Sequence, residues 1–182
     1  GGVFVALKGN RDDGWHYVDS AVKAGVALVL TDSDQWHEIA GVQVVHDKSL
    51  KNYLGQLAGA CFGWPTNSID IIGVTGTNGK TSVSLFIAQM LTQMGYPCGY
   101  IGTNGSGLIG EIKPLSNTTP NIIDLNRILA GMLANGAEYC AMEVSSHGLE
   151  QNRVSGIKFA STAFTNLSRD HLDYHKTMED YA

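Results

Sequence analysis

The chain has 182 residues, 43% of them hydrophobic, and a formal net charge of −5 at pH 7. This hydrophobic content is enough to bury a core, so the composition excludes an intrinsically disordered chain. Charged residues make up only 16% of the sequence and acidic residues outnumber basic ones, which excludes a basic nucleic-acid-binding surface. No stretch approaches the ~20 apolar residues of a membrane-spanning helix, and the first residues do not form a basic, apolar leader. We therefore expect a cytoplasmic protein.

The first part of the chain alternates short apolar strands with amphipathic helices. Strands are predicted at residues 3–7, 27–30 and 42–45, and helices at residues 15–24 and 49–61. This order is typical of a small βαβ-type unit. Residues 62–68, which include Gly63 and Pro65, are predicted to form a linker.

A more regular alternation follows the linker. Strands are predicted at residues 71–75, 96–101, 139–144 and 159–166, helices at 80–94 and 117–135, and a hairpin within 102–114. Alternating strands and helices predict an α/β fold whose mostly parallel sheet is covered on both faces. The predicted domains are residues 1–64 and residues 65–182.

A glycine-rich loop lies between the strand at 71–75 and the helix at 80–94. Gly76 and Gly79 allow backbone N–H groups to curl around phosphate oxygens, and the following helix N-terminus adds partial positive charge. Lys80 supplies a full cation for the β- and γ-phosphates, and the Thr81 hydroxyl is placed to bind Mg²⁺. The loop is shorter than the common phosphate loop, since Val74 replaces its first glycine. The alternative is an ordinary strand–helix turn followed by an incidental lysine.

Glu143 ends a predicted buried strand, at the edge where parallel sheets gather their ligand sites. A carboxylate there can complete the Mg²⁺ coordination begun by Thr81. The alternative is a solvent-facing residue at a strand end.

Two histidines, His171 and His175, are spaced four residues apart and would share one face of a helix. A zinc site would need a third ligand and a catalytic glutamate, but the residue after His171 is Leu172. Asp170 and Asp173 are placed to orient these imidazoles. For His147, two roles stay open: a place in the site, or a hydrogen bond within its own turn.

Hydroxyl, amide and guanidinium groups cluster in two further segments. Such groups recognise sugars, peptides, carboxylates and phosphates. The residues are Asn117, Thr118, Thr119, Ser145, Gln151 and Arg153. For Thr118 and Thr119, which precede Pro120, helix capping is the alternative.

Three ordered motifs carry a resemblance to a known family. They are Thr75-Gly-Thr-Asn-Gly-Lys-Thr81, Glu143-Val-Ser-Ser-His-Gly-Leu149 and Thr165-Asn-Leu-Ser-Arg-Asp-His-Leu-Asp-Tyr-His175. The first resembles the ATP loop of the Mur ligase superfamily, which also includes the folylpolyglutamate synthetases. The other two resemble the members that add a diamino acid to UDP-N-acetylmuramoyl-L-alanyl-D-glutamate during peptidoglycan precursor synthesis.

The resemblance implies an ATP- and Mg²⁺-dependent amide ligase. ATP would convert the D-glutamyl γ-carboxylate into an acyl phosphate, which the amine of a diamino acid, meso-diaminopimelate in preference to lysine, then attacks. It implies catalytic roles for Lys80, Glu143 and His171, metal binding by Thr81, Glu143 and His171, and structural support by His175. The implied nucleotide-binding residues are Gly76, Thr77, Asn78, Gly79, Lys80, Thr81 and Ser82.

The resemblance also assigns the partner substrate, a UDP-muramoyl-dipeptide. The implied contacts are Asn117, Thr118, Thr119, Ser145, Gln151 and Arg153, with backbone contacts from Asn10, Arg11 and Asp12. Residues 1–64 would be a UDP-substrate domain lacking its start, and residues 65–182 a truncated ATP-binding domain. The resemblance places a carbamylated lysine and a C-terminal amino-acid-binding domain beyond Ala182, so we expect the chain to be catalytically incomplete. We also expect a monomer.

Three alternatives remain open at this point. One is a sister Mur ligase or a folylpolyglutamate synthetase-like ligase, although the latter should lack the first UDP-binding unit. The second is a nucleotide-binding module without ligase activity, against which the Glu143 and His171 motifs argue. The third is that the chain is a fragment of a longer ligase, which leaves the parent's function unchanged.

Overall fold

The computed structural model describes residues 1–9 and 12–182, so the predicted contacts at Asn10 and Arg11 lie outside the described residues. The chain forms two compact units, Gly1–Leu54 and Gly55–Ala182. Their boundary falls inside the helix α2 (Leu50–Cys61), whereas the predicted domain boundary follows residue 64. The second half of α2 packs within the second unit, because a Cβ at Gly55 would lie only 2.0 Å from the Ser155 carbonyl oxygen.

The first unit contains a three-stranded parallel sheet in the order β1-β2-β3. Its strands are β1 (Gly2–Ala6), β2 (Val26–Thr31) and β3 (Gln43–His46). The predicted helix at 15–24 is divided into a 3₁₀ turn, η1 (Gly14–Tyr17), and the short helix α1 (Val18–Lys23). Trp15 and Val18 from these turns pack with Ala6 and Val29 of the sheet in a small core.

The second unit is built on a five-stranded sheet in the order β6-β5-β7-β4-β8. The strands are β4 (Asp70–Thr75), β5 (Cys98–Gly102), β6 (Gly105–Leu108), β7 (Tyr139–Glu143) and β8 (Phe159–Phe164). β5 and β6 form an antiparallel hairpin, and every other pairing is parallel. The structure confirms the predicted α/β class and its mostly parallel sheet.

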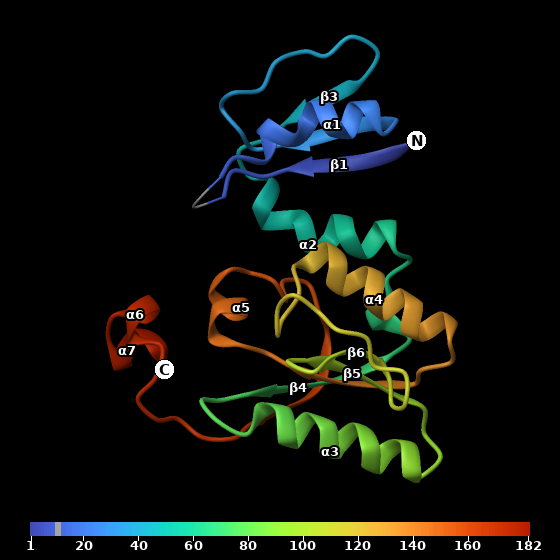
Figure 1. Cartoon of the computed structure of the whole chain (residues 1–182), viewed down its shortest axis with the longest axis vertical. Coiled ribbons are helices and arrows are strands. Elements are labelled where there is room, and N and C mark those ends of the chain that lie inside the picture. Colours follow the sequence, from blue (N-terminus) through green and yellow to red (C-terminus); the bar gives the residue numbers. More distant parts are fainter. Residues whose placement is uncertain (10–11) are drawn as a thin grey trace. The chain divides into compact units, whose positions relative to one another are not determined.

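Helices cover both faces of this sheet (Figure 1). α3 (Lys80–Gln93) lies on one face and α4 (Ile122–Ala134) on the other. The shorter elements are η2 (Pro65–Asn67), α5 (Ser146–Glu150), α6 (Leu172–His175) and α7 (Met178–Tyr181). Tyr100 and Ala141 pack beneath Ala88 of α3, while Met132 of α4 packs over the bare strand at Gly99. In the described part of the chain, no helix combines the length and apolarity needed to cross a bilayer.

The predicted start of the α4 helix is wrong. The helix begins at Ile122, and its N-cap is Asn121, whose side-chain oxygen accepts hydrogen bonds from the amides of Ile123 and Asp124 at 3.1 and 3.0 Å. Asparagine is a strong N-cap residue, so it takes the place that the sequence pattern assigns to residues 117–119. Residues 117–120 are therefore free to form an irregular segment before the helix.

The parallel pairing brings functional segments to one edge of the sheet. The carboxyl ends of β4 and β7 lie side by side, with Val74 in register with Glu143, and β5 runs parallel to β7 on its other side. The glycine loop, Glu143 and the residues after Gly102 thus emerge together, which is the edge where open α/β sheets bind ligands.

Candidate active site

The glycine loop after β4 takes the backbone conformations for which its glycines are suited. Gly76 and Gly79 have φ values of 126° and 86°, and Gly79 precedes Lys80 at the first position of α3. A Cβ at Gly76 would lie 2.2 Å from the Thr165 hydroxyl oxygen, so a larger residue would push the loop away from the segment after β8. The loop therefore depends on glycine for both conformation and close approach.

The segment after β8 braces this loop. The Thr77 amide donates to the Asn166 carbonyl at 2.8 Å, and the Thr165 hydroxyl donates to the Asn78 carbonyl at 2.6 Å. The Ser168 amide in turn donates to the Thr77 hydroxyl at 2.9 Å. Sequence reasoning missed this bracing role, although Thr165 and Asn166 open the third motif and follow a strand adjacent to β4.

Lys80 folds back over the loop that precedes it. Its ammonium group donates to the carbonyls of Gly76 and Thr77 at 2.6 and 2.9 Å. These neutral carbonyls hold the cation where the loop curves, and an ammonium group has three donors to share with an anion. Ser82, by contrast, is exposed on α3 and does not line the cavity that the neighbouring loop residues surround.

Glu143 is the buried carboxylate of the site, with only 1% of its surface exposed. Its Oε2 accepts a hydrogen bond from the Thr81 hydroxyl at 2.9 Å, which joins the end of β7 to the start of α3. Thr103, just after β5, adds its amide to Oε1 at 2.9 Å and its hydroxyl to Oε2 at 3.2 Å. The structure thus brings together the two residues predicted to share a Mg²⁺ ion.

Tyr100 is a further partner of Glu143. Its hydroxyl donates to Oε1 at 2.5 Å, and its side chain is fully buried. Burial first, and then the hydrogen bond to Glu143, raise the pKa of Tyr100 well above the usual value of a phenol, so this hydroxyl remains a donor. Sequence reasoning missed Tyr100 and Thr103. The available signal was the position of Thr103 after a strand that neighbours β7.

The segment before α4 and the loop after β7 meet at the same place. Thr119 is 1% exposed, and its hydroxyl donates to the Glu143 carbonyl at 3.1 Å and accepts from the Ser145 amide at 3.0 Å. Arg153 donates to the Thr119 carbonyl at 2.9 Å and also to the side-chain oxygen of Gln151. Gln151 therefore orients the guanidinium group rather than lining the cavity itself.

These segments surround one cavity of about 490 Å³ in the second unit. It combines residues predicted for nucleotide, metal and substrate binding. Its lining consists of Thr77, Asn78, Gly79, Lys80, Thr81, Thr103, Asn117, Thr118, Thr119, Glu143, Ser145, His147, Arg153 and His171. The Lys80 and Arg153 cations and the loop amides suit anionic oxygens, while the hydroxyls and Asn117 suit a polar, uncharged moiety.

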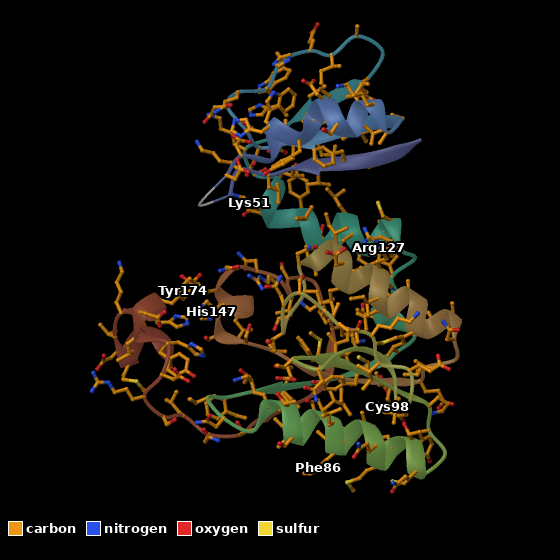
Figure 2. All side chains as sticks on the ribbon, viewed as in Figure 1. Lys51, Phe86, Cys98, Arg127, His147 and Tyr174 are labelled. Atoms are coloured by element: carbon orange, nitrogen blue, oxygen red, sulfur yellow. The ribbon has the colours of Figure 1, made fainter. Side chains whose placement is uncertain are left out.

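A group of histidines lies on the rim of this cavity. The rings of His147 and His171 meet edge to face with centroids 5.1 Å apart. The ring centroids of Tyr174 and His147 lie 4.0 Å apart (Figure 2). Burial first, and then the electrostatic effect of the neighbouring His171 and His175, lower the pKa of His147 below its usual value. His147, which sequence reasoning left unassigned, thus lies in the cavity wall.

His171 and His175 play different structural parts. His171 precedes α6 in the left-handed region, with φ of 52°, so the pair does not lie along one helix face. His175 is 9% exposed, and its Nε2 lies 2.9 Å from the Ser146 hydroxyl oxygen, whereas His171 lines the cavity. The Asp170 carboxylate accepts from the backbone amide of His171 at 2.8 Å.

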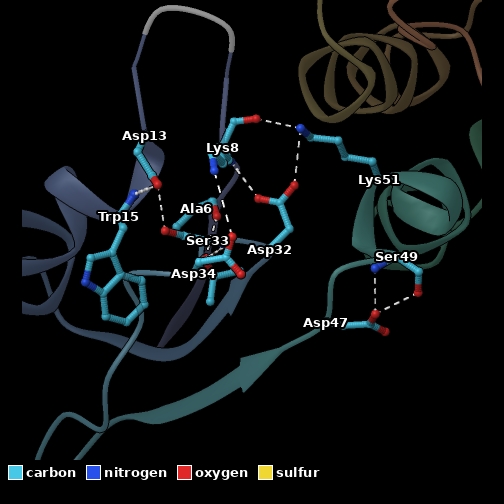
Figure 3. A network of polar contacts seen from close by, with 11 residues as sticks. Ala6, Lys8, Asp13, Trp15, Asp32, Ser33, Asp34, Asp47, Ser49 and Lys51 are labelled. Carbon is cyan, nitrogen blue, oxygen red and sulfur yellow. Dashed lines mark hydrogen bonds and ion pairs between the residues drawn. The ribbon is translucent and has the colours of Figure 1, made fainter.

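Asp12, the described residue of the predicted UDP-contact loop, belongs to the first unit. Its carboxylate lies 3.0 Å from His16 Nδ1, accepts from the Tyr17 hydroxyl at 2.5 Å, and accepts from the amide of Asp13 at 2.8 Å. A second network follows the carboxyl ends of β1 and β2, where Asp32 accepts from the Lys8 amide and pairs with Lys51 (Figure 3). These groups bond mainly to one another.

Comparison with known proteins supplies the family. A family model described as the Mur ligase middle domain matches residues 74–182, which include the whole cavity lining. The chain belongs to the Mur ligase family. The match covers the glycine loop, Glu143 and the histidine motif, the three segments that carry the resemblance in sequence.

Solved structures of Mur ligases resemble the chain as well. A UDP-N-acetylmuramoyl-L-alanyl-D-glutamate–2,6-diaminopimelate ligase is 29% identical with a TM-score of 0.81, and the match covers 98% of this chain and 36% of that one. MurF ligase from Thermotoga maritima, solved in complex with ADP, is 22% identical with a TM-score of 0.64, and the match covers 98% of this chain and 38% of that one. MurF from Acinetobacter baumannii is 17% identical with a TM-score of 0.65, and the match covers 98% of this chain and 35% of that one. The two MurF structures support the fold. The chain thus spans little more than a third of the length of these Mur ligases.

Proposed function

We propose that this chain is the ATP- and UDP-substrate-binding part of an amide ligase in peptidoglycan precursor synthesis. The ligase would add meso-diaminopimelate to UDP-N-acetylmuramoyl-L-alanyl-D-glutamate, in the cytoplasm. One observation carries the proposal: the glycine loop with Lys80, the carboxylate of Glu143, and the Thr119–Arg153 group line a single cavity. Residues 1–64 would form the UDP-substrate domain and residues 65–182 the ATP-binding domain.

The nucleotide phosphates would lie on the glycine loop. The loop amides and the N-terminus of α3 favour negative charge there, and Lys80 would exchange its bonds to the Gly76 and Thr77 carbonyls for phosphate oxygens. Positioning and charge neutralisation account for most of the catalysis of phosphoryl transfer. Lys80 would neutralise charge that develops as the terminal phosphoryl group moves to a substrate carboxylate, giving an acyl phosphate. The amine of the diamino acid would then attack the acyl carbon, and inorganic phosphate would leave as the amide forms.

The donor set beside this loop fits a magnesium ion. Thr81 and Glu143 offer a hydroxyl and a carboxylate oxygen at the cavity wall, and Mg²⁺ prefers oxygen ligands. Within residues 1–9 and 12–182, no group of three or more His, Cys, Asp or Glu side chains forms a complete metal cage. This agrees with an ion that takes its remaining ligands from phosphates and water. When bound, Mg²⁺ would neutralise phosphate charge, and Thr81 and Glu143 would hold it. His171 would contribute to a second metal position.

The substrate would occupy the remainder of the cavity. Arg153, oriented by Gln151 and the Thr119 carbonyl, would bind a carboxylate or phosphate of the UDP-muramoyl-dipeptide. Asn117, Thr118 and Ser145 would contact its sugar and peptide groups, and Asp12 would contribute a backbone contact to its UDP portion. The similarity to MurF structures makes a sister Mur ligase with a longer peptide substrate the second candidate.

The test is substrate-dependent release of ADP. The longest open reading frame that contains this chain is assayed with Mg²⁺-ATP, UDP-muramoyl-dipeptide or tripeptide, and diaminopimelate, lysine or D-alanyl-D-alanine. The proposal expects rapid ADP release only with the dipeptide and diaminopimelate together. Faster release with the tripeptide and D-alanyl-D-alanine would favour the sister ligase. A rate of ADP release that does not change when any UDP-linked substrate is added would contradict both ligase assignments and favour a nucleotide-binding module.

A further inference from the structure

Tyr100 is the buried phenol that touches the carboxylate at the cavity floor. It lies in the middle of β5, with its side chain packed beneath Ala88 of α3 and its exposed fraction at 0%. Its hydroxyl donates to Glu143 Oε1 at 2.5 Å. A buried tyrosine hydroxyl needs a partner, and here that partner is the carboxylate assigned to the metal rather than a backbone carbonyl.

The two carboxylate oxygens of Glu143 have different sets of hydrogen-bond donors. Oε1 accepts from the Tyr100 hydroxyl and from the Thr103 amide at 2.9 Å. Oε2 accepts from two hydroxyls, that of Thr81 at 2.9 Å and that of Thr103 at 3.2 Å. Hydroxyl groups rotate and can turn to accept or donate elsewhere. Oε2 is therefore the oxygen that a cation beside Thr81 can share, while Oε1 is held from the sheet side.

The strand is shaped to let the phenol and the carboxylate meet. Tyr100 and Gly102 are two residues apart on β5, so they lie on the same face of the sheet. A Cβ at Gly102 would lie 2.1 Å from Glu143 Oε1 and 2.4 Å from the Tyr100 hydroxyl oxygen. Only a glycine leaves room for both oxygens at this point, which makes the contact a feature of the strand and not of one rotamer alone.

We propose that Tyr100 is a positioning residue that holds Glu143 Oε1 and thereby presents Oε2 as a single-oxygen ligand to the metal ion beside Thr81. The inference rests on the proposed Mg²⁺-nucleotide site and adds a residue to it. Residues that hydrogen-bond metal ligands fix the orientation of those ligands, and their loss typically weakens metal affinity or activity by about 10–100-fold. Tyr100 itself touches neither metal nor nucleotide in this scheme.

The test compares Tyr100→Phe with a matched control, Tyr139→Phe. Both variants remove one phenol hydroxyl from the α3 side of the sheet, but Tyr139 begins β7 whereas Glu143 ends it. Electron paramagnetic resonance measures the binding of Mn²⁺ in the presence of a non-hydrolysable ATP analogue. We expect at least about tenfold weaker Mn²⁺ binding for Tyr100→Phe, wild-type affinity for Tyr139→Phe, and unchanged affinity of both for the analogue without metal.

The outcomes separate the inference from the proposed function. Wild-type protein that binds neither the analogue nor Mn²⁺ would contradict the proposed function and the inference with it. Wild-type binding that Tyr100→Phe retains in full would overturn the inference alone. Loss of metal-free analogue binding in Tyr100→Phe would also overturn it, because the phenol would then support the loop and not the ligand.

A second measurement needs no variant. The Tyr100 hydroxyl proton, shielded from water and bonded to a carboxylate, should give a slowly exchanging, downfield proton resonance, identified by its coupling to a ¹³C-labelled tyrosine ring. Saturation with Mg²⁺ and the ATP analogue should preserve this resonance, since Tyr100 keeps Oε1 while the ion takes Oε2. Its disappearance on metal binding would show that Glu143 leaves Tyr100, and would overturn the proposal even if Tyr100→Phe failed to fold.

Discussion

The two units gather polar side chains in the same way, at the carboxyl ends of parallel strands, but use them differently. In the first unit, the Asp32 side chain is 7% exposed and accepts from the Lys8 amide at 2.6 Å and from the Lys51 ammonium at 3.2 Å (Figure 3). In the second unit, Glu143 is equally well bonded but lines a cavity of about 490 Å³. The polar groups around Asp32 bond to one another, which we call a closed network, whereas those around Glu143 border a cavity.

This contrast shows that strand ends alone do not make a ligand site. In the first unit, acidic groups meet lysines, a histidine and hydroxyls of the same unit, so their charges are already compensated. In the second unit, Lys80 bonds only to neutral carbonyls of its own loop, which leaves its charge available to an anion. We therefore expect substitutions in the first unit to change stability and pH response, and those in the second to change binding and catalysis.

The largest effect is expected for Lys80→Ala. Removing the cation should lower kcat/KM of the complete ligase by several orders of magnitude, because the role we propose for Lys80 is to neutralise phosphate charge at the loop. The melting temperature should change little, since the ammonium group serves the loop and does not pack in the core. Steady-state ADP release and thermal unfolding measure the two properties.

Lys158→Ala is the matched control, because Lys158 is exposed in the same unit and lies outside the cavity. It should retain wild-type activity. If Lys80→Ala kept more than about a tenth of wild-type kcat/KM, a loss of only about 1.4 kcal/mol in transition-state stabilisation, Lys80 would not have the proposed role.

Substitutions at Glu143 and at His171 should affect metal binding differently. Glu143→Gln should weaken Mn²⁺ binding in the presence of a non-hydrolysable ATP analogue by about 10–100-fold or more, because it removes the anionic oxygen that we propose as a ligand. His171→Ala should leave this first ion in place, since its proposed protein ligands are the oxygens of Thr81 and Glu143 and a hard cation prefers oxygen to imidazole nitrogen. The stoichiometry for this chain should be one ion. Two fully occupied ions in the unmodified chain would contradict this expectation.

The sequence predicted much of the second unit, because strand, loop and helix are local there and agree with one another. The loop from Gly76 to Thr81 and the strand before Glu143 are confirmed in place. The bonds of Glu143 to Tyr100 and Thr103 span 43 and 40 residues, and nothing in local periodicity encodes such contacts. The same holds for Thr165, which contacts the loop from 87 residues away.

Errors in the sequence analysis have local causes. The start of α4 was misplaced because both Thr119 and Asn121 precede a helical pattern, and Asn121 provides the cap. Thr119 is instead buried against Glu143 and Ser145, so its hydroxyl serves tertiary contacts. The close approach of Gly55 to Ser155, by contrast, joins segments 100 residues apart, which pattern analysis of either segment cannot reveal.

A stability effect in the first unit should follow from Asp13→Ala. The Asp13 carboxylate is 8% exposed; it accepts from the Ser33 hydroxyl at 2.6 Å and from the Trp15 amide at 2.9 Å, where it caps η1. Losing the cap and leaving the buried hydroxyl without its acceptor should lower the free energy of unfolding by about 1–3 kcal/mol. Urea unfolding followed by tryptophan fluorescence measures this change. Asp19→Ala, at an exposed position on α1, should stay within about 0.5 kcal/mol of the unmodified protein; an equal loss in both variants would contradict the closed-network interpretation.

The smallest effect concerns the exposed pair of His16 and Asp12. The hydrogen bond that His16 donates to the Asp12 carboxylate raises the pKa of His16 above its ordinary value of 6.5, and hydrogen bonds from Tyr17 and then His16 lower the pKa of Asp12. Because the folded pKa of His16 is the higher one, its contribution to stability is fully present below about pH 6.5 and is lost as the pH rises through the folded pKa.

Histidine ring resonances followed by NMR from pH 5 to 9 should therefore show His16 titrating above its ordinary value in the unmodified chain. Asp12→Asn should return the His16 midpoint toward that value, since the amide carries no charge. Tyr17→Phe is the matched control: it removes another donor to Asp12 but leaves the His16 contact, so the raised midpoint should persist. A His16 midpoint that is unchanged by Asp12→Asn would mean that the first unit is not closed through this pair, and that the Asp12 carboxylate is free to meet a ligand.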